Sequence, residues 1–292
     1  MTHSTRAPRI GSLLFAYRGT IMPVIVWRLA FTVLLSLVIA VLDLRYGWFG
    51  GGLNATPLTL MGLTLAIFLG FRNTVAYQRW WEARNLWGEL LISSRDLARQ
   101  VRAFLPGAAA EERARLIGMV IAFAHALRHH LRGTDATRDL ARWLSPRLAD
   151  AIAVAPNRPA FLLHRLGVGL ADAARAGHVD PILLASIDAK VSSLSHVLGG
   201  CERIRGTPIP FSYILMLHRS VYVYCFFLPF CLVGVLGWFT PAVVAILAYT
   251  FFGLDALGDQ IEDPFDVMPN DLPLDAYSTT IQNDLLALMA ND

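Results

Sequence analysis

Charged residues are scarce in this chain. Only 16% of its 292 residues are Asp, Glu, Lys or Arg, whereas 55% are hydrophobic. A soluble domain of this size usually carries about 25% charged residues. The shortage excludes an ordinary soluble protein and indicates a chain that folds in a lipid bilayer.

Cysteine and strong net charge are also in short supply. The three cysteines, Cys201, Cys225 and Cys231, form no CxxC pair, so we expect neither a disulfide framework nor a zinc site. The net charge is only +3, without a basic stripe interleaved with aromatics, which argues against nucleic acid as a partner. Residues 1–20 lack the short apolar core and small-residue cleavage site of a secretory signal, so we expect a cytoplasmic arm.

Motifs of catalysis and of cofactor binding are missing as well. There is no nucleophile elbow, no Gly-rich phosphate loop and no spaced pair of acids in an apolar helix. His125 and His129 are four residues apart, a spacing that can hold a transition metal, but no third ligand lies nearby in sequence. We therefore expect a protein that is not an enzyme, with no cofactor and no metal.

Long apolar stretches are what the chain does have. Residues 21–42 contain a single charge, Arg28, whose side chain we expect to extend to the headgroups. The stretch Leu53–Phe71 has 19 residues without a charge, enough to cross about 30 Å of hydrocarbon. The stretch Ser220–Leu254 has 35, so it must turn, and Gly237–Pro241 can break it. The sequence predicts an all-α membrane protein with four transmembrane helices.

The middle of the chain has a different character. The segment Arg72–Pro210 carries 18 arginines and one lysine against 12 acids, with helical periodicity in residues 86–105, 114–131 and 182–204. Arginines next to the apolar stretches predict that this segment and both termini lie in the cytoplasm. We expect a multi-pass protein of the cell inner membrane. The predicted parts are an N-terminal arm (1–20), transmembrane helices one and two (21–71), a helical cytoplasmic region (72–212), transmembrane helices three and four (213–258) and a cytoplasmic C-terminal segment (259–292).

The second apolar stretch carries two neighbouring rows of residues with a spacing of four. Small residues form one row (Gly62, Ala66, Gly70) and bulky apolar residues form the other (Leu63, Ile67, Phe71). Small residues let membrane helices approach closely, so several copies around an axis could turn the bulky row inward as a hydrophobic neck. The spacing alone favours ordinary packing inside a monomeric four-helix bundle, and periodicity does not decide between the two.

Four ordered motifs resemble the bestrophin family, especially its bacterial branch. The first is Gly-Phe-Arg-Asn-Thr-Val-Ala-Tyr-Gln-Arg-Trp-Trp-Glu-Ala-Arg-Asn-Leu-Trp-Gly at residues 70–88. The others are Asp-Pro-Ile-Leu-Leu at 180–184, Cys-Glu-Arg-Ile-Arg at 201–205 with Thr-Pro-Ile-Pro-Phe at 207–211, and Glu-Asp-Pro-Phe at 262–265 with Asn-Asp-Leu-Pro-Leu-Asp at 270–275. The resemblance extends from about Arg9 to Leu288.

This resemblance implies a homopentameric ion channel with one central pore in the lipid bilayer. By motif position, the neck falls on Leu63, Ile67 and Phe71, and a cytoplasmic aperture falls on Ile182. Animal members bind calcium through acids after the Pro-Phe pair, but here Met268 stands where another acid is expected. We therefore expect Glu262, Asp263 and Asp266 to pair with arginines of the cytoplasmic body. We expect Arg72 and Arg79 to be interface anchors paired with Glu82 and Glu89, since buried arginines are usually paired, and the alternative is that they face the pore and attract anions.

The permeant ion could be an anion or a cation, and the sequence supports an argument for each. The resemblance implies chloride or other anions, yet the apolar neck has no fixed charge and discriminates by hydration and size. A ring of Asp180 carboxylates near the aperture would favour cations, so a cation-selective channel of the same fold is an alternative. Two further classes of protein fit the apolar helices: a secondary transporter, for which we find no internal repeat, and a non-conducting membrane scaffold.

Overall fold

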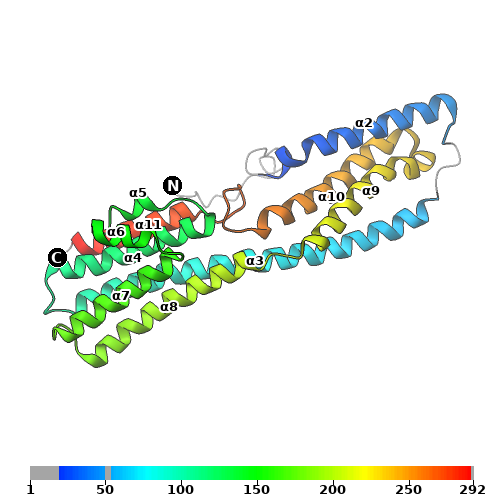
Figure 1. The fold of residues 1–292 in the computed structure, drawn as a ribbon. Helices are drawn as coiled ribbons and strands as arrows, with labels where there is room; N and C mark the ends of the chain where they lie inside the picture. The colour runs from blue at the N-terminus through cyan, green and yellow to red at the C-terminus, as the bar shows by residue number, and fades with distance from the viewer. Residues whose placement is uncertain (1–19, 50–53, 291–292) are drawn as a thin grey trace. The chain divides into compact units, whose positions relative to one another are not determined.

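The computed structural model describes residues 20–49 and 54–290, and these are helical, with no strand among them. The elements in chain order are α2 (Met22–Tyr46), α3 (Ala55–Phe104), α4 (Ala110–Arg132), α5 (Thr137–Leu140), α6 (Pro146–Ala153), α7 (Arg158–Arg175), α8 (Pro181–Gly206), α9 (Phe211–Leu236), the short 3-10 helix η1 (Gly237–Phe239), α10 (Thr240–Glu262) and α11 (Leu274–Ala290) (Figure 1). The predicted arm 1–20 lies outside the described residues except for Thr20.

The chain divides into two compact units, and α3 contributes to both. The first, which we call the membrane unit, comprises the described residues up to Gln78 together with Ile209–Glu262 and Met268–Asn270. The second, the body unit, comprises Arg79–Pro208, Asp263–Val267 and the described residues from Asp271 onward. Each unit has its own apolar core.

The membrane unit is built from α2, the first part of α3, α9 and α10. Helix α10 packs against both α2 and α9, and the shared core includes Ile25, Leu69, Val221 and Phe252. The turn between α9 and α10 falls at Gly237, whose φ of 51° is a left-handed conformation that glycine adopts without steric cost. The predicted helical hairpin is therefore confirmed.

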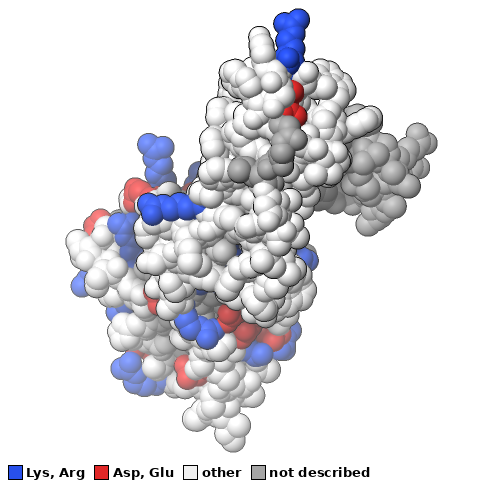
Figure 2. All heavy atoms as spheres, turned by 90° about the vertical axis from the view of Figure 1, so that its right-hand side faces the viewer, with Lys and Arg blue, Asp and Glu red and all other residues white. Residues whose placement is uncertain are grey.

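Four stretches of the described chain are long and apolar enough to cross a membrane. They are Met22–Tyr46, Ala55–Phe104, Pro181–Gly206 and Phe211–Glu262, the last of which contains both arms of the hairpin. Helix α8 meets the criterion, but its apolar face is buried in the core of the body unit through Ile187, Leu194 and Val197. We therefore treat α2, the first part of α3, α9 and α10 as the membrane helices, because their apolar surfaces are extensively exposed. Figure 2 shows large uncharged areas on the face that it presents, with charged side chains gathered in patches.

The body unit surrounds α4. This helix is buried over nearly all of its circumference between Leu116 and Leu127, and it packs against α7, α8 and α11. Close packing requires a glycine at 169, where an added Cβ would lie 2.9 Å from Leu116 Cδ2. The helices predicted at residues 86–105, 114–131 and 182–204 all form, as parts of α3, α4 and α8.

Candidate pore site

Helix α3 packs through one narrow face in the membrane unit. Leu65, Leu69 and Arg72 are buried on that face, with 4%, 0% and 1% of their surfaces exposed. Leu63, Ile67 and Phe71 are 61%, 49% and 63% exposed. At about 100° per residue, the centres of these two rows lie roughly 180° apart around the helix. The bulky row predicted from the sequence is therefore left free by packing within the subunit.

The row of small residues lies between these two faces. A Cβ added at Gly62 would come within 2.8 Å of the Tyr224 hydroxyl, so this glycine allows α9 to approach α3 inside the subunit. Ala66 and Gly70 are exposed, and a Cβ added at Gly70 would meet no atom within 4 Å. Gly62 therefore serves packing within the subunit, whereas Ala66 and Gly70 lie on an open surface.

A buried arginine sits beside the bulky row. Arg72 Nη1 lies 3.0 Å from Asp255 Oδ1 on α10, and neither side chain is exposed to solvent. Arg72 Nη2 also pairs with Asp259 and lies 3.6 Å from Glu262 Oε2. A buried charge is tolerated where paired carboxylates replace its hydration shell. These contacts fix the rotation of α3 about its own axis.

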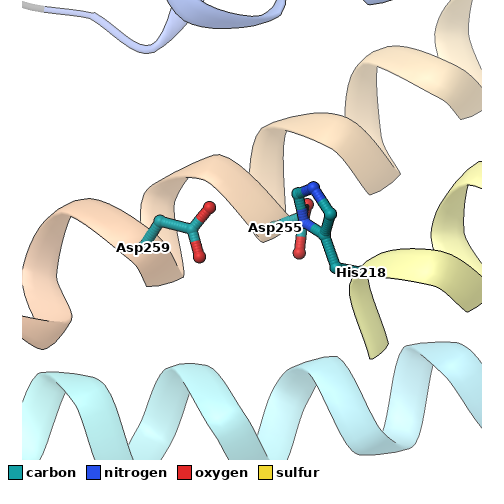
Figure 3. Close-up of side chains that lie close together, drawn as sticks. All are labelled: His218, Asp255 and Asp259. Atoms are coloured by element: carbon teal, nitrogen blue, oxygen red, sulfur yellow. Dashed lines mark ion pairs between the residues drawn. The ribbon is translucent and has the colours of Figure 1, made fainter. Parts of the chain in front are cut away.

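The Asp255 carboxylate has further partners on α2 and α9. His218 Nδ1 lies 2.7 Å from Asp255 Oδ2, and the imidazole points toward the carboxylate (Figure 3). Arg28 Nη1 lies 4.0 Å from the same oxygen, and its guanidinium stands 5.3 Å from the Tyr222 ring centroid. The Arg28 side chain remains 29% exposed, so its expected extension to the headgroups stays a prediction.

His218, Asp255 and Asp259 are also the residues most suited to a metal among those the structure describes. Each offers a ligand atom, and these atoms lie within 4.8 Å of one another. Both carboxylates already bind Arg72, whose positive charge opposes a divalent cation at the same place. The geometry is that of an ion-pair network joining α2, α3, α9 and α10.

Arg79 is an anchor too, but not of the kind expected. Its guanidinium donates to the carbonyl oxygens of Ile204, at 2.7 Å, and Thr207, at the end of α8. A cation at the C-terminus of a helix satisfies carbonyls that lack partners within the helix. Glu82 instead binds Arg203. Arg72 and Arg79 thus anchor helices within the subunit, and the expected pairing with Glu82 and Glu89 is wrong.

The predicted aperture residue lies in the first turn of α8. Ile182 is 81% exposed, and its backbone N–H donates to Asp180 Oδ1 at 2.8 Å. Asp180 is therefore the N-cap of α8, a role that Asp performs well because its carboxylate accepts from the free N–H groups of the first turn. The sequence reasoning missed this cap, although Asp before Pro-Ile at a helix start is its usual signal.

The acidic segment after α10 uses its groups in several ways. Glu262 does pair with an arginine, but with Arg72 of the membrane unit. Asp266 accepts from Arg132 through its backbone carbonyl, at 3.5 Å. The expectation that these acids pair with arginines of the body is therefore only partly met.

The two histidines of α4 have separate partners. His125 Nε2 lies 3.0 Å from Gln282 Oε1, whereas His129 Nε2 lies 3.0 Å from Asp139 Oδ2. Burial lowers the pKa of His125, and the hydrogen bond from His129 lowers the pKa of Asp139. The pair holds α5 and α11 against α4.

Comparison with known proteins agrees with this architecture. A sequence model of the Bacterial/Fungal Bestrophin protein family matches residues 1–287. A voltage-dependent anion channel-forming protein of Mesorhizobium japonicum is 42% identical over 92% of this chain and 86% of its own length. A protein of the same description from Escherichia coli K12 is 42% identical, over 94% of this chain and 90% of the relative.

Comparison with solved structures also finds bestrophin homologues. A bacterial bestrophin homologue from Klebsiella pneumoniae is 41% identical, superposes with a TM-score of 0.86, and covers 91% of this chain and 98% of that one. These relatives are channels, which confirms that the chain is a membrane channel protein and not an enzyme. Family-wide similarity over nearly the whole length shows that the chain belongs to the bacterial and fungal branch of the bestrophin family.

Proposed function

We propose that the chain forms a homopentameric anion channel in the cell inner membrane, with both termini in the cytoplasm. Chloride is the first candidate ion, because the curated relatives are named voltage-dependent anion channel-forming proteins. The partners of each subunit are then four further copies, the permeant inorganic ions and the lipid bilayer. The body unit forms the cytoplasmic part of the pore.

The exposed apolar row of α3 carries this proposal. Leu63, Ile67 and Phe71 point away from the packing face of their own subunit, and Ala66 and Gly70 lie open on the flank. Small residues let a neighbouring α3 come close, and close approach around an axis brings the bulky row inward. Three stacked apolar rings would then form a neck that controls conduction through hydration.

Ile182 is proposed as the second constriction. It is highly exposed in the subunit, and the Asp180 cap fixes the start of its helix. An apolar ring there would discriminate among ions by size and dehydration. Ile182→Ala should therefore change the relative permeability of small and large anions. An unchanged permeability sequence would remove Ile182 from the pore.

Cation selectivity is a second candidate because of the position of Asp180. The exposed side chain of Asp180 lies two residues before Ile182, so a ring of these carboxylates would attract cations at the entrance. Reversal potentials under a chloride gradient, measured on purified protein in planar bilayers, decide between the two signs. Step-like currents indicate a channel, whereas saturable uptake without current would indicate a transporter. Absence of both currents and uptake would indicate a non-conducting scaffold.

Cysteine accessibility tests the neck directly. The native cysteines are all buried, so a cysteine introduced at Ile67 would be the main site for a charged methanethiosulfonate reagent. A negative reagent in the neck should repel anions and reduce the current. Leu34→Cys is the matched control, because Leu34 is 60% exposed on α2, outside the proposed pore. Equal effects at both positions would contradict the neck.

A further inference from the structure

A cavity of about 390 Å³ lies within the body unit, at the junction of α4, α6 and α7. These three helices lie together in the fold (Figure 1). Its wall also includes the segment before α6, with Trp143, Leu144 and Ser145. The volume is in the range of small-molecule sites, about 300–1,000 Å³.

Each of the three helices turns one side toward the cavity. On α7 the wall residues Phe161, Arg165 and Val168 follow a helical spacing of three and four. On α4 and α6 the pairs are Arg115 with Met119 and Arg147 with Ala151, again four apart. Every helix therefore brings one arginine to the same cavity.

The side chains of these three arginines are exposed to solvent and are available to a ligand. Arg115, Arg147 and Arg165 make no ion pair or hydrogen bond through their side chains with any residue in the described ranges. Asp172, the acid of the wall, lies 2.6 Å from Arg175. The nearest acids in sequence, Glu111 and Asp150, lie one turn from Arg115 and Arg147 but pair with neither.

The start of α6 adds to the positive potential. Ser145 is its N-cap, with an extended backbone, and its side chain makes no capping hydrogen bond. Pro146 follows at the first position of the eight-residue helix. A helix N-terminus carries partial positive charge and free N–H groups, which favour an anion.

Apart from Ser145 and Asp172, the rest of the wall is apolar. Trp143 and Phe161 are partly buried against the core of the unit, and Leu148 lies beside them. Aromatic faces and aliphatic side chains bind the apolar part of a small molecule. The cavity thus combines three guanidinium groups with an apolar surface.

We propose that this cavity binds a small phosphorylated compound, with the phosphate between the three arginines and the apolar part against Trp143 and Phe161. Guanidinium groups match phosphate oxygens in charge and in planar geometry. The site belongs to the body unit alone and does not depend on the ion that the channel conducts.

The test uses the purified full-length oligomer in detergent. Isothermal calorimetry would compare phenyl phosphate, inorganic phosphate and phenol as probes. Phenyl phosphate should bind most tightly, inorganic phosphate more weakly, and phenol not measurably. Arg147→Gln/Arg165→Gln should weaken phenyl phosphate binding at least tenfold, because two charge-assisted contacts are lost. Trp143→Ala should abolish the preference for phenyl phosphate over inorganic phosphate.

Arg138→Gln/Arg142→Gln is the matched control, since these arginines are exposed on the preceding segment and do not line the cavity. It removes the same net charge and should leave the affinity unchanged. Equal weakening in both double variants would reduce the effect to general electrostatics and overturn the site. Absence of saturable phenyl phosphate binding to the unmodified oligomer would overturn it as well, even if the cavity variants fail to fold.

Discussion

Arg72 and Asp255 form an ion pair with 3.0 Å between Nη1 and Oδ1, and both side chains are completely withdrawn from solvent. The pair joins α3 to α10 across 183 positions of sequence. Arg72 follows Phe71 directly, so the two side chains leave the helix about 100° apart. By holding Arg72 inside the unit, the pair keeps the adjacent Phe71 on the exposed side of α3.

Removal of the Arg72 guanidinium should therefore be strongly destabilising. Arg72→Met keeps the volume of the side chain but removes one of the two close cationic partners of the buried Asp255 carboxylate, the other being His218. Breaking one side of a buried ion pair costs about 3–5 kcal/mol. Thermal unfolding of the detergent-solubilised oligomer, followed by size-exclusion chromatography, would measure the loss.

An exposed ion pair provides the matched control. Arg175 and Asp172 lie 2.6 Å apart, with 74% and 54% of their side chains exposed. Arg175→Met should change the stability by less than about 1 kcal/mol, because solvent screens such pairs. If both variants unfold at the same temperature, the buried pair does not hold α3.

Gly62 and Gly70 of α3 should respond differently to an added side chain. Gly62→Ala places a Cβ 2.8 Å from the Tyr224 hydroxyl and should destabilise the subunit, by about 1–3 kcal/mol for overpacking. Gly70→Leu meets open space in the subunit, so it should leave subunit folding intact and reduce the oligomer fraction. Multi-angle light scattering would measure the mass. Gly167→Leu, also in open space but on α7, is the control, and equal masses for both leucine variants would contradict an α3 interface.

Much of this fold could be predicted from the sequence because it depends on local patterns. Long apolar runs define α2, α9 and α10, and Gly237 marks the turn of the hairpin. The exposed row of α3 also follows a simple periodicity. Periodicity could not show whether the bulky row or the face with Leu65 and Leu69 packs within the subunit. Both faces carry apolar residues, and either could be buried.

The partners of the arginines could not be predicted in this way. We expected Arg72 and Arg79 to pair with acids a few residues away on the same helix, since such pairs are neighbours on a helix surface. The actual partners come from α8 and α10, more than 120 residues later. Such pairs depend on the tertiary arrangement of helices. The local sequence therefore identified Arg72 and Arg79 as anchoring residues but did not identify the groups that they bind.

Simultaneous truncation of the bulky row should open the neck. Leu63→Ala/Ile67→Ala/Phe71→Ala removes three exposed side chains, so we expect a higher conductance or open probability in planar bilayers. Phe31→Ala/Leu34→Ala/Val38→Ala is the matched control, with three exposed apolar residues on one side of α2. Unchanged currents from the assembled neck variant would show that the row lies elsewhere.

Asp180 has two proposed roles that substitution can separate. Asp180→Asn removes the charge but keeps a good N-cap, so stability should hold while cation permeability falls if the carboxylate faces the pore. Asp180→Ala removes both, and loss of the cap should cost about 0.5–2 kcal/mol. Reversal potentials and thermal unfolding would be measured on both variants. If Asp180→Asn leaves the permeability ratio unchanged, the residue acts as a cap alone.

Acid should weaken the body unit through Asp275. The hydrogen bond from Arg132 Nη1, at 2.6 Å, lowers the pKa of Asp275 below its ordinary 3.8. A carboxyl whose folded-state pKa is lowered contributes stability at pH values above its ordinary pKa, and this contribution is lost as the pH falls through the lowered folded value. Asp275→Asn should thus reduce the unfolding temperature at pH 7 and flatten its decline below about pH 4.

Asp188→Asn is the control, because Asp188 is an exposed acid of α8 without a partner among the described residues. This variant should keep the pH profile of the unmodified protein. Parallel profiles for the unmodified protein and Asp275→Asn would show that the Arg132 contact does not contribute to stability.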